Sequence, residues 1–125
     1  LTHAPLESVA VEQVLEAHAC GSVLEFSGKV RPLEQGRPIR GIVYEVYEEM
    51  AKKVISDIVC SLQPTHPVDA VGIWHRYGFV AVGEAAIFMR VASAHRQEGI
   101  GFLADFMNAL KEQVPIWKAE VVYEG

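Results

Sequence analysis

Apolar residues recur at helical spacing in three segments of the chain. In residues 48–62 they stand three or four positions apart, at Met50, Val54, Ile55, Ile58, Val59 and Leu62. A second stripe in residues 94–113 continues until Pro115 interrupts it, and its members are Ile100, Leu103, Phe106, Met107, Leu110 and Val114. A shorter stripe covers residues 8–19 and stops before Gly21, which suits a helix C-terminus. The pattern predicts two long amphipathic helices and one short N-terminal helix.

Five other segments have the alternating or continuously apolar pattern of β-strands. They are residues 22–30, 42–47, 68–77, 85–92 and, as an edge strand, 116–123. Residues 32–40 contain two prolines, a glycine and two arginines without any period, so they are predicted to form a mobile loop. Ser93 precedes the second long helix and is a suitable N-cap residue.

The order of these elements predicts a single α+β domain over residues 1–125. A mixed or antiparallel sheet would pack against the two long amphipathic helices. The sequence contains no internal repeat, low-complexity stretch or linker. Half of its 125 residues are hydrophobic. This composition suits a compact domain that buries roughly two-thirds of the surface of its unfolded chain.

Charge and cysteine content narrow the classes of function. With 11 basic and 16 acidic side chains the net charge is −5, which argues against a general nucleic-acid or membrane-surface binder. No stretch approaches the roughly 20 apolar residues that span a bilayer. Cys20 and Cys60 stand far apart in a chain with no apolar signal segment. We therefore expect free thiols with packing roles and a cytoplasmic location.

Ser93-Ala94-His95-Arg96 is the sharpest candidate for an anion site. A buried strand meets a helix start there, and two cationic side chains stand beside backbone N–H groups that lack helical partners. On this tetrapeptide alone, an ordinary capped helix with a surface arginine is an equally good interpretation.

Three further basic groups are candidates for a site, at Lys111 with Lys118, at Gly28-Lys29-Val30-Arg31 and at His75-Arg76. Taken singly, each lysine is more readily explained by its favourable interaction with a helix C-terminus. The other two groups could equally be strand ends in solvent. The five histidines are scattered and neither cysteine has a partner at ligand spacing, so we expect neither a metal nor a cofactor.

These features follow one another in an order that resembles a known family. The blocks are Phe26-Ser27-Gly28-Lys29-Val30-Arg31, His75-Arg76-Tyr77-Gly78, Ala94-His95-Arg96 and Val114-Pro115-Ile116-Trp117-Lys118-Ala119-Glu120. From about Gly21 to Glu120 the chain resembles the large, catalytic subunit of molybdopterin synthase. The Ala-His-Arg and Pro-Ile-Trp-Lys blocks in this order are specific for that family.

The resemblance implies a hammerhead-like α+β fold and an enzyme of molybdenum cofactor biosynthesis. It implies a homodimer that binds a small ubiquitin-like sulphur-carrier protein at each end, giving a heterotetramer. The carrier's C-terminal Gly-Gly thiocarboxylate would donate sulphur to cyclic pyranopterin monophosphate. The product would be the dithiolene of molybdopterin.

The resemblance also implies roles for seven side chains. Lys111 and Lys118 correspond to the active-site lysines. Arg31, His95 and Arg96 correspond to residues that bind the anionic groups of the substrate. Phe26 and Met107 correspond to residues that form the walls of the substrate pocket. Fixed Lys and Arg side chains suit these roles physically, because thiocarboxylate, phosphate and a developing oxyanion are all negative.

Two considerations bear on how such a site would work. Arg96 and Lys111 stand fifteen residues apart on one predicted helix, a separation of roughly 22 Å, so a shared pocket would need two subunits. Ala119 replaces a second basic residue that the family usually has after Trp117-Lys118, and family members commonly continue further beyond this block. A non-catalytic relative that keeps the dimer and binds the carrier without turnover is therefore the alternative.

Overall fold

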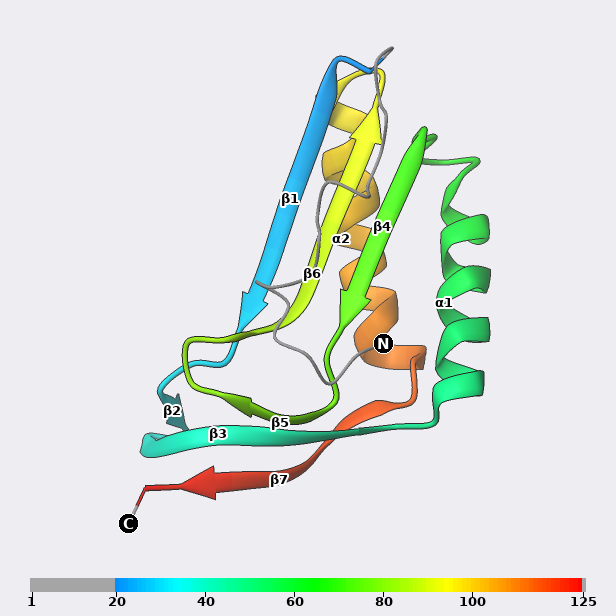
Figure 1. Cartoon of the computed structure of the whole chain (residues 1–125). Helices are drawn as coiled ribbons and strands as arrows, with labels where there is room; N and C mark the ends of the chain where they lie inside the picture. The colour runs from blue at the N-terminus through cyan, green and yellow to red at the C-terminus, as the bar shows by residue number, and fades with distance from the viewer. Residues whose placement is uncertain (1–19, 125) are drawn as a thin grey trace.

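The computed structural model describes residues 20–124, which form two antiparallel sheets and two long helices (Figure 1). The elements are β1 (Ser22–Lys29), β2 (Leu33–Glu34), β3 (Arg37–Val46), α1 (Glu48–Leu62), β4 (Ala70–His75), β5 (Gly78–Ala81), β6 (Ala85–Ser93), α2 (Arg96–Gln113) and β7 (Ile116–Tyr123). The expected α+β class with two amphipathic helices is confirmed. The helix predicted for residues 8–19 lies outside the described residues.

The first sheet has the strand order β1-β6-β4, with both pairings antiparallel. Helix α2 runs along one face of this sheet in contact with β1 and β6, and α1 packs beside α2 (Figure 1). Side chains alternate along β1, so that Leu24 and Phe26 turn toward the helices while Glu25 and Ser27 are exposed. The alternation predicted for this strand is therefore correct.

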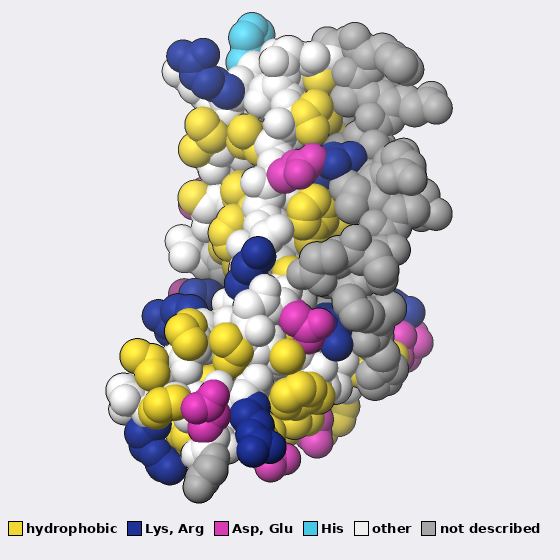
Figure 2. Space-filling view, turned by 60° about the vertical axis from the view of Figure 1, so that its left-hand side comes forward, with side chains coloured by type: hydrophobic (Ala, Val, Ile, Leu, Met, Phe, Trp, Pro, Cys, Tyr) yellow, Lys and Arg dark blue, Asp and Glu magenta, His cyan; other side chains and the backbone are white. Residues whose placement is uncertain are grey.

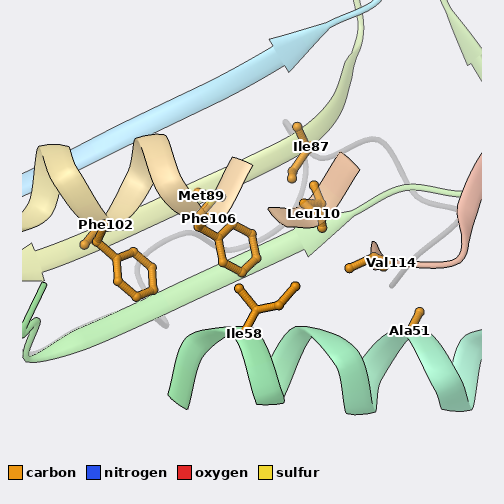
Figure 3. Packing of buried hydrophobic residues seen from close by; sticks show 9 residues of the cluster. Ala51, Ile58, Ile87, Met89, Phe102, Phe106, Leu110 and Val114 are labelled. Carbon is orange, nitrogen blue, oxygen red and sulfur yellow. The ribbon is translucent and has the colours of Figure 1, made fainter. Parts of the chain in front are cut away.

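The main hydrophobic core lies between the first sheet and the two helices. Its buried members are Ala51, Ile58, Ile87, Met89, Val91, Phe102, Phe106, Leu110 and Val114. Figure 3 shows Ile58 of α1 pointing toward the ring of Phe106 on α2. The rings of Phe102 and Phe106 stack with centroids 5.9 Å apart. Met50 and Ile100, expected in the core stripes, are instead 59% and 54% exposed, because the buried faces of α1 and α2 do not include them.

The second sheet is built around β3, which pairs antiparallel with β2, β5 and β7. A smaller core lies on this sheet, formed by Val30, Ile39, Ile42, Val80 and Ala86. The pairing of β1 with β6 shifts register after Gly28, and Val30 then exchanges backbone hydrogen bonds with Gly83 and Glu84. This bulge bends the end of β1: Lys29 still pairs with Ala85 of β6, and Val30 beyond it packs into the smaller core of the second sheet.

Three sequence-based assignments were wrong. Residues 32–40 form a hairpin rather than a loop, because Gln35 and Gly36 both take positive φ angles of 51° and 78° and make a tight two-residue turn. Strand β5 was missed because it has only four residues. Ser93 does not cap α2: its hydroxyl donates to the carbonyl of His95, and His95 itself occupies the N-cap position.

The packing of α2 generates a test of stability. Phe106 is fully buried, whereas Ile100 on the same helix is 54% exposed. We expect Phe106→Ala to lower the free energy of unfolding by about 3–5 kcal/mol through lost contacts and a cavity. The control Ile100→Ala should change it by no more than about 0.5 kcal/mol. Urea unfolding followed by circular dichroism measures both, and equal effects would contradict this core.

Candidate active site

A pocket of about 380 Å³ lies where the two sheets meet the C-terminal end of α2. The end of β1, the β2–β3 hairpin, β4, β6, α2 and β7 all contribute to its lining. The lining residues are Phe26, Gly28, Lys29, Val30, Arg31, Glu34, Ile42, Tyr44, His75, Ala86, Ile87, Met107, Leu110, Lys111, Ile116, Trp117 and Lys118. Its volume is in the range of small-molecule sites, which are typically about 300–1,000 Å³.

Four cationic side chains from three separate segments line this pocket. Lys29 and Arg31 come from the bent end of β1, Lys111 from the last turn of α2, and Lys118 from β7. Each of these residues is exposed, so their charged ends are accessible to a ligand. The walls between them are apolar, with Phe26 and Met107 half-buried. A pocket of this kind attracts an anion and strengthens the interaction once the ligand displaces water.

A β-bulge sets the direction of Lys118. In the pairing of β3 with β7, Val43 lies opposite Glu120 but the next residue, Tyr44, lies opposite Lys118, so Ala119 is the extra residue. Bulges of this kind bend a strand and re-aim the neighbouring side chains. The Lys118 Nζ atom lies 3.6 Å from the Glu34 Oε2 atom, which comes from the β2–β3 hairpin.

Two polar rings form the inner part of the pocket. Burial lowers the pKa of His75, and its Nδ1 atom lies 2.8 Å from the carbonyl oxygen of Arg76. A carbonyl only accepts, so Nδ1 carries the proton and Nε2 is the free acceptor of a neutral imidazole. Burial and then the charge of Glu34 raise the pKa of Tyr44, which keeps its phenol protonated. The two rings meet edge to face, with centroids 5.7 Å apart.

His95 and Arg96 lie at the opposite end of α2, in a separate open depression of about 470 Å³ with Gly21, Ser22, Ala94 and Gln97. Figure 2 shows basic side chains at the upper end of the view, where α2 begins in Figure 1, and a second basic group toward the lower end. Arg96 and Lys111 are separated by roughly 22 Å along the helix, as its rise requires. One small ligand within this chain cannot contact both residues.

Comparison with known proteins decides the family. The model of the MoaE protein family matches residues 1–113. The chain belongs to the MoaE protein family. It is 36% identical over 112 residues to the molybdopterin synthase catalytic subunit of Pyrococcus abyssi, covering 90% of this chain and 76% of the relative. It is 34% identical over 115 residues to the bovine enzyme's catalytic subunit, covering 92% of this chain but only 61% of that relative.

Solved structures of this family share the fold. Molybdopterin synthase from Staphylococcus aureus superposes with a TM-score of 0.78 at 27% identity, covering 94% of this chain and 91% of that one. A complex of subunits 1 and 2 of molybdopterin-converting factor from Helicobacter pylori superposes with a TM-score of 0.69 at 22% identity, over 86% and 73% of the two chains, and shows the fold alone. The family resemblance and the fold expected from the sequence are confirmed.

The structure brings together five of the seven side chains that the family resemblance singled out. Phe26, Arg31, Met107, Lys111 and Lys118 line the pocket, whereas His95 and Arg96 lie far from it. Lys29 and His75 also line the pocket. Glu34 and Tyr44 were not among the predicted site residues: the hairpin that positions Glu34 was predicted to be a loop, and Tyr44 carries no charge that would single it out within its strand.

Other candidate residues have structural roles or lie elsewhere. Arg76 is 8% exposed, and its Nη1 atom donates to the Glu84 Oε1 atom at 3.0 Å. A hydrogen bond from the Ala81 backbone and this contact lower the pKa of Glu84. Both cysteines are free thiols outside the pocket, as expected. Their expected packing roles are wrong: Cys60 is exposed, and Cys20 is half-buried with its thiol donating to Asp69.

Within residues 20–124, no three His, Cys, Asp or Glu side chains lie close enough together to hold a metal ion. No helix in that range has both the length and the apolar character needed to cross a membrane.

The lowered pKa of His75 predicts a pH dependence of stability. The unfolded chain has the ordinary histidine pKa of 6.5 and takes up this proton more readily than the folded protein does. The free energy of unfolding should therefore fall as pH drops below 6.5 toward the folded pKa. His75→Asn keeps a donor for the Arg76 carbonyl but does not titrate, so it should lose less stability between about pH 7 and pH 5. Urea midpoints at several pH values test this, and an unchanged acid sensitivity would refute it.

Proposed function

We propose that this chain transfers sulphur from the thiocarboxylated C-terminus of a small ubiquitin-like carrier protein to cyclic pyranopterin monophosphate, as a molybdopterin synthase catalytic subunit. The observation that carries the proposal is the convergence of Lys29, Arg31, Lys111 and Lys118 on one apolar-walled pocket. In a chain with a net charge of −5, such a local basic site favours a small anionic ligand over a large one. Family membership supports the same assignment.

The pocket offers a group for each charge in this reaction. Arg31 suits the phosphate, because its planar guanidinium can donate two parallel hydrogen bonds. Lys118 provides a further positive charge, which would stabilise the thiocarboxylate and the oxyanion that develops during acyl transfer. Lys111 is the preferred group for proton transfer, because its ammonium is a compact charge on a flexible chain that can reach the reacting atoms.

A carrier protein supplies the sulphur in this proposal, so neither cysteine takes part. The match to a two-subunit complex of molybdopterin-converting factor from Helicobacter pylori supports a small partner subunit. A Gly-Gly tail has no side chains, so it can enter a pocket of about 380 Å³ beside a second ligand. Phe26 and Met107 would pack against the tail and the pterin.

His95 and Arg96 belong to the same reaction only if a second copy of the chain supplies them. Their distance from Lys111 excludes a shared ligand within one chain. A two-fold homodimer would place this end of α2 from one protomer against the pocket of the other and would create two equivalent sites. With a carrier bound at each end, the assembly would be a heterotetramer.

Ala119 is one of the two grounds for the non-catalytic alternative, and the structure weakens this one. Ala119 is the bulged residue of β7 and is absent from the pocket lining, whereas Lys118 beside it is present. A basic residue at position 119 is therefore not needed to complete the lining. Turnover of cyclic pyranopterin monophosphate with thiocarboxylated carrier separates the two functions, since the alternative allows carrier binding without product.

Replacing the pocket lysines tests the chemistry. Lys111→Ala should lower turnover by at least about 10²-fold, and Lys118→Ala should lower it by less, because each removes charge stabilisation from the reacting groups. Both side chains are exposed, so neither change should unfold the protein. The matched control is Lys53→Ala, an exposed lysine on α1 outside the pocket. Near wild-type turnover in Lys111→Ala would refute its role.

Subunit exchange tests the shared site. Inactive Lys111→Ala and inactive Arg96→Ala protomers, once mixed, should recover up to about a quarter of wild-type turnover. Random exchange makes half of the dimers mixed, and in each of these one site carries both lesions and the other carries neither. Product formation is measured before and after exchange, with tagged protomers to verify mixing. Absence of recovery despite verified exchange would rule out a site built from two subunits.

A further inference from the structure

One carboxylate stands in the otherwise cationic pocket. Glu34 is the only acidic side chain among the described residues that line it. Its side chain is 23% exposed, and Lys118 is its one charged partner among residues 20–124, at 3.6 Å. A carboxylate here opposes the binding of phosphate and thiocarboxylate, so an anion site alone gives no reason for its presence.

The rest of a pterin substrate has different requirements from its phosphate. The 2-amino group and the N3–H of a pterin point in the same direction, like two donors of a guanidinium group. A carboxylate accepts from such a pair with two parallel hydrogen bonds, which are both strong and directional. Lys and Arg have no acceptor, so the four cations of the pocket cannot recognise this edge.

Resting on the proposed function, we propose that Glu34 determines specificity for the pterin by accepting hydrogen bonds from its 2-amino group and N3–H. Lys29, Arg31 and Lys111 bind the anionic groups at the other end of the same substrate. Lys118 holds the carboxylate through Oε2, and because each carboxylate oxygen can accept two hydrogen bonds, both oxygens still have acceptor sites for the pterin. Glu34 thus selects a 2-amino-4-oxo pyrimidine ring over its 2-oxo counterpart, which presents an acceptor at the same position.

The surrounding structure orients Glu34 for this role. It is paired with Arg37 across the two-residue turn of the β2–β3 hairpin, which fixes the direction of its side chain. Tyr44 lies opposite Lys118 in the β3–β7 ladder, and the charge of Glu34 acts on its phenol. Three polar groups from three strands therefore meet on one side of the pocket, while Lys29, Arg31 and Lys111 belong to other elements.

Two fluorescent ligands that differ only at C2 test the proposal. Pterin-6-carboxylate and lumazine-6-carboxylate carry the same anionic group, but the second has an oxygen in place of the 2-amino group. Titrated at about pH 6.5, the wild-type protein should bind the pterin at least about tenfold more tightly. Glu34→Gln should weaken pterin binding by about tenfold or more and leave lumazine binding unchanged or tighter, because the amide can donate to the 2-oxo group.

The control is Glu45→Gln, which removes the same charge from an exposed position on β3 outside the pocket and should keep the wild-type preference. If Glu34 is only a counter-ion of Lys118, then Glu34→Gln will tighten the binding of both anionic ligands alike. That result, a wild-type protein without preference, or a wild-type protein that binds neither ligand, overturns the proposal.

Kinetics keep this inference separate from the proposed function. In turnover with cyclic pyranopterin monophosphate, Glu34→Gln should raise KM by about tenfold and change kcat less, since the pterin edge does not react. If the wild-type protein binds pterin selectively but shows no turnover, the sulphur-transfer function is refuted. The proposal that Glu34 accepts hydrogen bonds from the pterin is then supported. Normal turnover with an unchanged KM in Glu34→Gln would refute the role of Glu34 alone.

Discussion

The packing of α2 against β6 is the interaction on which the rest of the structure depends. Phe102, Phe106 and Leu110 follow one another at four-residue spacing and bury one stripe of the helix against Met89 and its neighbours. This stripe fixes both the rotation of the helix and its position along the sheet. Packing of the central part of α2 therefore determines the positions of both ends of the helix, where Arg96 and Lys111 lie.

The pocket lies at the joint between two sheets rather than on either of them. The bulge after Gly28 bends the end of β1 and brings Lys29 and Arg31 to the pocket, and β7 brings Lys118 along the second sheet. Three different segments therefore hold the cations, so like charges can be kept near one another although they repel. Such an arrangement costs stability, which the two hydrophobic cores must offset.

The sequence predicted the parts of the fold that rest on long periodic patterns. Helices α1 and α2 and strands β1 and β6 were predicted because each has eight or more residues with a periodic or continuously apolar sequence. The short elements were not predicted, because β2 has only two residues and β5 only four. The Gln35-Gly36 turn also lacks the Asn-Gly or Asp-Gly sequence that usually indicates such a hairpin. The site residues differ in the same way between those that the sequence predicted and those that it did not. Lys111 and Lys118 were found through the family blocks, whereas Glu34 depends on a turn conformation that only coordinates reveal.

The bulge at Ala119 makes the pocket sensitive to chain length rather than to side-chain identity at that position. Side chains alternate between the two faces of a strand, so one residue more or fewer reverses every side chain on one side of the change. Loss of residue 119 would restore a regular ladder between β3 and β7, and either Lys118 or the segment from Glu120 onward would exchange faces. Among descendants of this sequence, substitutions at position 119 can accumulate freely, whereas a single-residue insertion or deletion in this stretch of β7 would reverse either Lys118 or the end of the strand.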